Sequence, residues 1–196
     1  MAFANRLAAS PAAAPSRSKY SGISCADTRD PMLGLGEYRV RVTACAEGYN
    51  PGKRRDSYKT SLHVVSAEDG SETRAGSSCT VVSFLTPAGL SELKRFAMHA
   101  AGFGPTLAQR ASGDNVRARL IAGEEQYDAL DESCGHQGAI LEASTGVANG
   151  APSLVGRLVD VVVARGKPVV NPQTGAETGD YYRVYTWGVV PEDVQP

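Results

Sequence analysis

The sequence predicts an α+β fold that is mainly β, with a helical insert between its third and fourth strands. The first observation is an alternation of apolar and polar residues in three stretches before residue 86 and in two stretches after residue 153, which is typical of strands. The second is an apolar face at three- and four-residue spacing after Pro87, which indicates a helix packed on the sheet. A hydrophobic content of 42% in 196 residues is enough for one domain with a core.

The first two strands are expected over about Gly36–Ala46 and Tyr58–Ala67. One face of each strand is apolar and is expected to point into the core: Tyr38, Val40, Val42 and Ala44 in the first, and Tyr58, Thr60, Leu62 and Val64 in the second. The other face carries Arg39 and Arg41 in the first strand, and Lys59 and His63 in the second.

The whole chain has a net charge of −1, so any binding of nucleic acid must depend on a local basic patch. Residues 36–60 supply such a patch, because six basic residues face only three acidic ones there. The turn between the two strands adds Tyr49 to this basic surface. Such a surface can follow a phosphate backbone and stack bases. The alternative interpretation is a solvated strand face without a ligand.

A third strand is expected over Ser77–Leu85, and the segment of about 86–153 that follows is expected to be a largely helical insert. In this insert, Thr86 is the predicted N-cap of a helix that ends near Gly102. A second short helix is expected over Pro105–Ala111. Three further stretches are predicted as follows: a strand or a helix over Val116–Ile121, a short acidic helix over Glu124–Ser133 and a short strand over Gln137–Glu142.

The last two strands are expected over Leu154–Arg165 and Tyr181–Val190, with a long loop over Lys167–Asp180. One face of the last strand presents Tyr181, Arg183, Tyr185 and Trp187, the only Trp of the chain. Bases stack on Tyr and Trp rings, and Arg pairs with phosphates. The alternative for Trp187 is a place inside the β core.

Three strands, a helix and two strands, with basic loops after the first and the fourth strand, favour an OB-like, five-stranded, partly open barrel. In this architecture the face of strands two and three and these two loops hold oligonucleotides. The predicted nucleic-acid-binding residues are Arg39, Arg41, Lys53, Arg54, Arg55, Lys59 and Arg183 for phosphates, and Tyr49, Tyr181, Tyr185 and Trp187 for bases.

Several segments together resemble the divergent single-stranded-DNA-binding proteins of tailed phages. They are GEYRVRV (36–42), a second strand that contains Lys, FAMHAAG (96–102), Leu158–Val163, and YRVYTW (182–187) followed by Pro191-Glu192. The resemblance extends over about residues 34–192. It implies a non-catalytic protein that sequesters single-stranded DNA during replication or recombination. The acidic C-terminal tail of such proteins is reduced here to Pro191-Glu192-Asp193, which puts the recruitment of partner proteins in doubt.

Residues 1–33 are rich in Ala, Ser and Pro and are expected to be a flexible arm before a single domain over 34–196. This arm has a basic, transit-peptide-like composition, and an arm that folds against a partner is an equal alternative. The alternative function is therefore that of a structural or assembly protein, such as a virion or tail component, whose arm contacts neighbouring subunits. Homo-oligomers, replication proteins and RNA are further candidate partners.

Enzymatic and metal chemistry are not expected, and no cofactor is predicted. No GxSxG motif surrounds a Ser, and Cys134-x-His136 lacks the second pair of ligands that a structural zinc site needs. The four Cys form no CxxC pair and no secretory segment precedes them, so a reducing cytoplasm is expected, that of the host if the protein is viral. No apolar run reaches the length of a membrane span.

Overall fold

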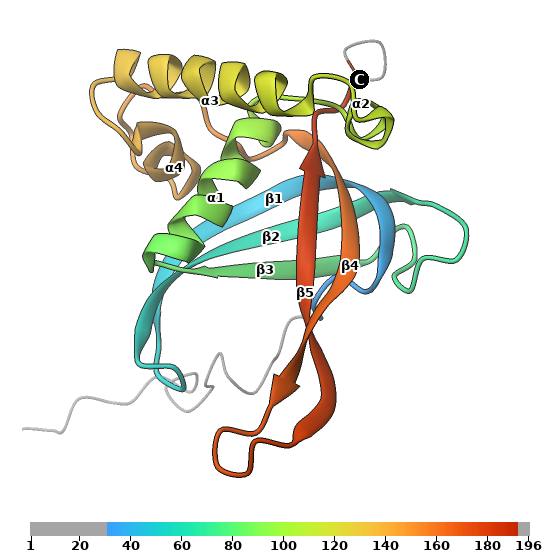
Figure 1. Cartoon of the computed structure of the whole chain (residues 1–196). Coiled ribbons are helices and arrows are strands. Elements are labelled where there is room, and N and C mark those ends of the chain that lie inside the picture. The colour runs from blue at the N-terminus through green and yellow to red at the C-terminus, as the bar shows by residue number, and fades with distance from the viewer. Residues whose placement is uncertain (1–30, 192–196) are drawn as a thin grey trace, which may run out of the picture.

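The computed structural model describes residues 31–191, so the flexible arm predicted for residues 1–33 and the end of the acidic tail lie almost entirely outside the described residues. Within this range, five strands form one antiparallel sheet and four helices lie between the third and the fourth strand. The α+β class and the place of the helical insert are therefore confirmed. The sheet is curved but not closed, since its strand order is β3-β2-β1-β4-β5 and the two outer strands are not hydrogen-bonded to each other (Figure 1).

The elements run in the following order: β1 (Gly36–Asn50), β2 (Arg55–Ala67), β3 (Ser78–Phe84), α1 (Pro87–Ala100), α2 (Leu107–Ser112), α3 (Val116–Ser133), α4 (Ala139–Ser144), β4 (Leu158–Val170) and β5 (Glu177–Gly188). The central strand β1 pairs along almost its whole length with β2, and its first residues, Gly36–Arg41, also pair with β4. Figure 1 shows the result, in which β4 and β5 cross the sheet formed by β1, β2 and β3.

The alternation predicted for β1 holds as far as Val42 and then changes face. Tyr38, Val40 and Val42 are buried, but Ala44 is exposed and Cys45 is buried in its place. The register with β2 shifts between Val42 and Ala44, which marks an irregularity of the β-bulge type. One extra residue at a bulge turns all following side chains to the opposite face, so the prediction that Ala44 points into the core is wrong.

Helix α1 begins and ends close to where the sequence predicts. The Thr86 hydroxyl accepts a hydrogen bond from the Gly89 amide at 3.2 Å, which is the expected N-cap. Helix α1 lies against β3, β4 and β5, and Phe96 on its buried face meets Trp187 of β5 edge-on, with 5.0 Å between the ring centroids. The helix therefore fills one end of the space that the curved sheet encloses.

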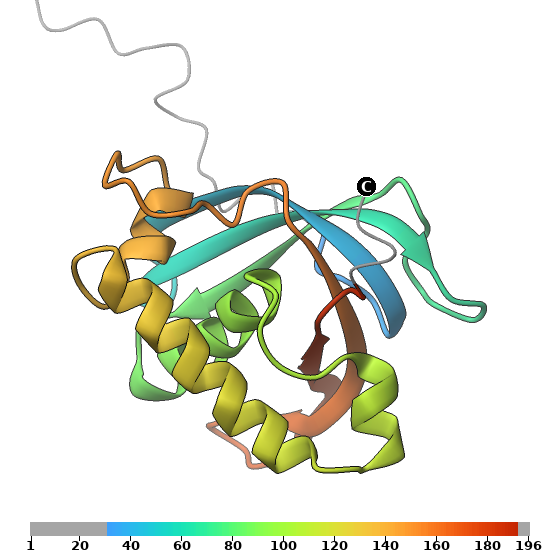
Figure 2. The ribbon, with the colours of Figure 1, turned by 90° about the horizontal axis from the view of Figure 1, so that it is seen from above.

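Helix α3 joins two stretches that the sequence analysis kept apart. Val116–Ile121, for which strand and helix were both open, is its first part, and the predicted acidic helix over Glu124–Ser133 is its second. Gly123 lies between them without ending the helix, and a Cβ atom at this position would lie only 2.7 Å from the Gly104 amide nitrogen. The residue is a point of close packing. Figure 2 shows α3 crossing the end of the molecule, outside α1.

The structure has a helix, α4, where the sequence analysis expected a short strand over Gln137–Glu142, and the Asp131 carboxylate stabilises the start of this helix. Asp131, at the end of α3, is buried and accepts hydrogen bonds from the amides of Gly138 and Ile140. These are amides at the start of α4, which have no partner within the helix itself. The strand prediction is wrong because this cap comes from a residue seven or more positions away.

The loop expected over Lys167–Asp180 is mostly strand. Strand β4 continues to Val170 and β5 begins at Glu177, so the turn covers only residues 171–176. Pro168 is accommodated at an irregular position, since the register of β4 and β5 shifts on both sides of it. The two strands therefore form a long two-stranded hairpin that extends from the body of the molecule (Figure 1).

No helix within residues 31–191 is both long enough and apolar enough to cross a membrane.

The contribution of Trp187 to the core can be measured directly. Its side chain is only 4% exposed, so Trp187→Ala is expected to lower the free energy of unfolding by about 3–5 kcal/mol through loss of buried surface and formation of a cavity. The measurement is urea denaturation followed by circular dichroism. Tyr182→Ala on the same strand is the matched control, because this ring is 62% exposed and its loss is expected to change stability by less than about 0.5 kcal/mol. Equal losses in the two variants would contradict this description of the core.

Candidate nucleic-acid interface

The end of the β1–β2 hairpin, residues 49–59, carries the strongest local positive charge among the predicted site residues. We call it the first hairpin end. Four of its residues are basic and one is acidic, which gives a net charge of +3. Its Tyr49 ring is 61% exposed, and the basic residues of the turn itself, Lys53, Arg54 and Arg55, are exposed as well. These residues, which the sequence analysis placed in one loop, are brought together by a short turn over residues 51–54.

The outer part of the β4–β5 hairpin, residues 164–183, is a second surface with basic and aromatic side chains. It has three basic and two acidic residues, which gives a net charge of +1. We call it the second hairpin end. Arg165 lies directly opposite Arg183 in the register of the two strands, and the Arg165 guanidinium lies 4.6 Å from the centre of the Tyr181 ring. This distance is that of a cation–π contact. The sequence analysis missed Arg165, Lys167 and Tyr182, although a hairpin prediction that extended β4 beyond Arg165 would have found them.

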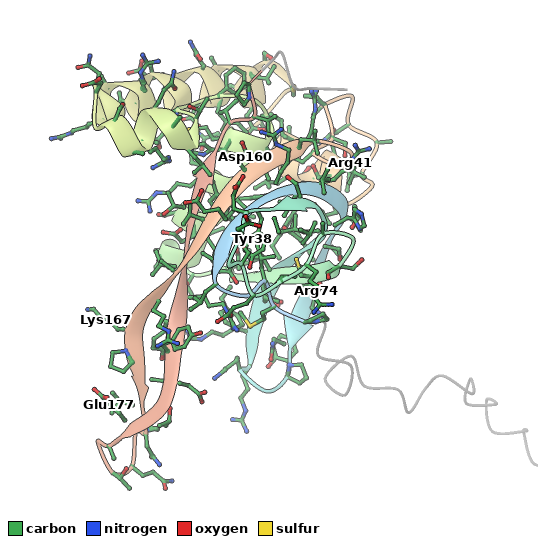
Figure 3. All side chains as sticks on the ribbon, turned by 90° about the vertical axis from the view of Figure 1, so that its right-hand side faces the viewer. Tyr38, Arg41, Arg74, Asp160, Lys167 and Glu177 are labelled. Carbon is green, nitrogen blue, oxygen red and sulfur yellow. The ribbon has the colours of Figure 1, made fainter. Side chains whose placement is uncertain are left out.

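The two hairpin ends extend in the same direction from the body of the molecule. Figure 1 shows both below the sheet, at the end opposite α3, and Figure 3 shows the same arrangement from the side, with Lys167 and Glu177 marking the second hairpin end. Two basic ends that extend from one side of a body offer phosphate contacts at two separate points.

Arg39 and Arg41 do not belong to this surface. Figure 3 places Arg41 and Asp160 at the other end of the molecule from Lys167. The Arg39 guanidinium also forms a two-point ion pair with Asp160 of β4, at 2.8 Å from Nε and 3.0 Å from Nη2. This pairing offsets the charge of Arg39. The single continuous basic face expected from Arg39 to Lys59 is thus divided, because β1 is long and bent.

Of the other predicted strand residues, Lys59, the last residue of the first hairpin end, is half-buried on the outer face of β2. Tyr185 stacks on Trp187 with 5.7 Å between the ring centroids and 9° between the ring planes. Because the Trp187 indole is buried, it is a member of the core, and no base can stack on it in this structure. For Trp187 the interpretation as a core residue replaces the predicted role in base stacking.

A groove of about 510 Å³ separates the outer edges of β3 and β5. Its lining is largely apolar, and the residues that surround it come mainly from β3, α1 and β5, with Thr60 from β2. Val82, Tyr182 and Val184 line it and are exposed although they are large and hydrophobic. The groove therefore lies between the two outer edges of the sheet, with an apolar floor between them.

Cysteine and metal chemistry find no support in the described residues. Burial raises the pKa of the Cys45 thiol, and it raises the pKa of the Cys79 thiol to about 11, so both thiols stay protonated at neutral pH. Cys134 is a free thiol, and His136 near it pairs with Glu142. Within residues 31–191 no three His, Cys, Asp or Glu side chains come together as a metal ion would need.

His99 is fully buried at the end of α1, where its two ring nitrogens have separate partners. Nδ1 lies 2.6 Å from the Arg95 carbonyl oxygen and donates to it, and Nε2 lies 3.0 Å from Arg110 Nη2 and accepts from it. This pattern fits only the neutral imidazole. Burial, and next the positive charge of Arg110, lower the pKa of His99 to about 4.

No family model matches this chain, and no curated protein matches it either.

The buried His99 predicts a loss of stability in mild acid. Its pKa is about 4 in the folded chain and about 6.5 when the chain is unfolded, so the unfolded state binds the proton first as the pH falls. The contribution of His99 is fully present above pH 6.5 and is lost between pH 6.5 and 4, by about 1.4 kcal/mol per pH unit.

Urea denaturation at pH 7.0, 5.5 and 4.5 measures this effect, and His99→Gln is expected to flatten the dependence over this range. His63→Gln, a change on the outer face of β2, is the control. A wild-type stability that stays constant from pH 7.0 to 4.5 would contradict a neutral, buried His99.

Proposed function

We propose that this chain is a non-catalytic protein that binds single-stranded DNA with little sequence preference, on an OB-like, partly open barrel. The observation that carries the proposal is that two separate hairpin ends, each with exposed basic and Tyr side chains, extend from the same side of one curved sheet. Basic residues that follow the backbone, combined with aromatic rings for bases, are the usual means of binding single strands without reading their sequence.

The topology supports the barrel part of the proposal. Five antiparallel strands, with β1 shared between β2 and β4, a helix after β3 and a gap between β3 and β5, fit a five-stranded barrel that is left partly open. In such barrels the connections between strands one and two and between strands four and five hold oligonucleotides. These two connections are the two hairpin ends of this chain.

The residues proposed to bind DNA differ in part from those expected from the sequence. Phosphates are assigned to Lys53, Arg54, Arg55, Lys59, Arg165, Lys167 and Arg183, and bases to Tyr49, Tyr181 and Tyr182. The exposed rings of Tyr49 and Tyr182 are available without any rearrangement. Arg41 is left out because it lies at the far end of the molecule. Arg39 is left out because its charge is offset by Asp160.

A role in assembly is the second candidate, and the apolar groove between β3 and β5 favours it. An unpaired strand edge beside exposed apolar side chains is a surface onto which another chain can add a strand. A protein with this role would show subunit contacts and no affinity for DNA.

Removing the positive charge of the first hairpin end tests the proposal. The triple variant Lys53→Ser, Arg54→Ser and Arg55→Ser is expected to bind a labelled poly-dT oligonucleotide at least about tenfold more weakly near 50 mM salt, because phosphate contacts dominate such binding. The slope of log affinity against log salt is expected to become less steep by about 2, since each lost contact on a single strand contributes about 0.7. Fluorescence anisotropy between about 50 and 200 mM salt gives both values.

The matched control removes three arginines away from the hairpin ends: Arg74→Ser, Arg117→Ser and Arg119→Ser. Arg74 lies in the loop between β2 and β3, and the other two are exposed on α3. This control has the same net charge as the test variant, so it separates a local contact from the overall charge. Equal effects of the two triple changes, or no binding by the wild type at either salt concentration, would contradict the proposal.

A further inference from the structure

The groove between β3 and β5 has an occupant at one end, namely the first residues that the structure describes. The Pro31 carbonyl accepts a hydrogen bond from the Thr80 amide of β3 at 3.1 Å, and the Met32 sulfur lies 3.5 Å from Arg183 Nη1 of β5. Residues 31 and 32 thus contact both strands that border the gap. Thirty residues precede Pro31, so a long segment of chain enters the described structure at this end of the groove.

The direction of the chain at this point is antiparallel to β3. Pro31 is bonded to Thr80, and four residues later the Leu35 carbonyl accepts from the Glu72 amide, which precedes β3. The residue numbers of the bonded partners therefore fall from 80 to 72 as this segment runs from Pro31 to Leu35, which is the antiparallel direction. In an antiparallel ladder of this register, the positions two and four residues before Pro31 would lie opposite Val82 and Phe84, both of which line the groove.

Two buried polar atoms in the groove have no hydrogen-bond partner within residues 31–191. They are Arg183 Nε and the Tyr185 hydroxyl oxygen. A buried donor without a partner costs free energy, about 1–3 kcal/mol, so each of them points to a ligand that completes the site. The thioether of Met32 is only a weak acceptor for the Arg183 guanidinium.

A carboxylate is available at the right position in the sequence. Asp30 comes two positions before Met32, whose sulfur lies near Arg183, and residues two apart in an extended chain point to the same side. An aspartate at this position of the strand supplies a negatively charged acceptor for the Arg183 guanidinium.

We propose that the segment before Pro31 adds to the outer edge of β3 as an antiparallel strand, with Arg29 opposite Val82 and with Asp30 paired to Arg183, and that it fills the groove of its own chain. The bound segment covers the unpaired edge of β3 and the exposed side chain of Val82. This inference does not depend on the proposed binding of DNA. The inference has one consequence for the proposed binding of DNA, because a segment that pairs with Arg183 competes with DNA phosphates for this side chain.

Disulfide trapping tests this register. In a background with Cys25→Ser and Cys134→Ser, the pair Thr28→Cys and Ser83→Cys places two thiols opposite each other in the proposed ladder, where neighbouring Cα atoms are about 4.5–5.5 Å apart. Mild oxidation is expected to join them within one chain, at a rate at least about tenfold higher than in a control pair. The control is Thr28→Cys with Ser66→Cys, which uses an exposed serine of β2 remote from the groove.

Non-reducing electrophoresis and peptide mass mapping separate the outcomes. A cross-link between residues 28 and 83 within one chain supports the proposal. A cross-linked dimer would show that the groove accepts this segment from a second copy, and equal rates in the two pairs would show that the segment does not enter the groove. Either result overturns the proposal.

Amide hydrogen exchange provides a second measurement on a chain without added cysteines. The Val82 amide is expected to exchange at least about tenfold faster in a chain that lacks residues 1–30 than in the wild type, because the deletion removes the carbonyl of residue 29 to which this amide donates in the proposed ladder. The Leu62 amide in the central part of β2 is the control and is expected to stay unchanged. A Val82 amide that exchanges equally fast in both proteins would overturn the proposal.

Discussion

The pairing of β1 with two different strands is the constraint on which the rest of this structure depends. Its first residues are hydrogen-bonded to β4 on one side while they are bonded to β2 on the other, and beyond Val42 only β2 remains as a strand partner. The sheet bends around this strand, whose register with β2 shifts between Arg39 and Val40 and again between Val42 and Ala44. The bend brings β3 and β5 to face each other across a gap, α1 covers one end of that gap, and the groove is the part of it that remains.

The parts of the fold that follow from local pattern could be predicted from the sequence. The alternation in β2 and the apolar run of β4 identify strands, and Thr86 followed by Pro87 identifies the start of α1. What could not be predicted depends on contacts between distant residues. The bulge near Thr43 is set by pairing with β2, and the helix α4 depends on a cap from Asp131. Gly123 in the middle of α3 approaches Gly104 too closely for a Cβ atom, and no local pattern reveals this contact.

The same distinction applies to the candidate site. The composition of the first hairpin end is visible in the sequence, since Tyr49 and the three basic residues lie within seven positions. The place of Arg39 is not, because its charge is offset by Asp160, which lies 121 positions away. A count of basic residues in a strand gives an upper limit to the charge of its surface. The ion pairs made across the sheet decide how much of that charge remains for a ligand.

The burial pattern gives a reason why the two hairpin ends, rather than the sheet, carry the exposed aromatic and basic residues. Beyond Cys45 in β1, beyond Val163 in β4 and before Trp187 in β5, no residue of these strands is fully buried. Two-stranded ribbons are at most marginally stable by themselves, so each hairpin end depends on the body of the sheet for its stability. Side chains such as Tyr49 and Tyr182 add little to the core at these positions. Their large apolar rings remain in water, where burying them against a ligand is favourable, whereas Trp187, with a similar ring, is already used by the core.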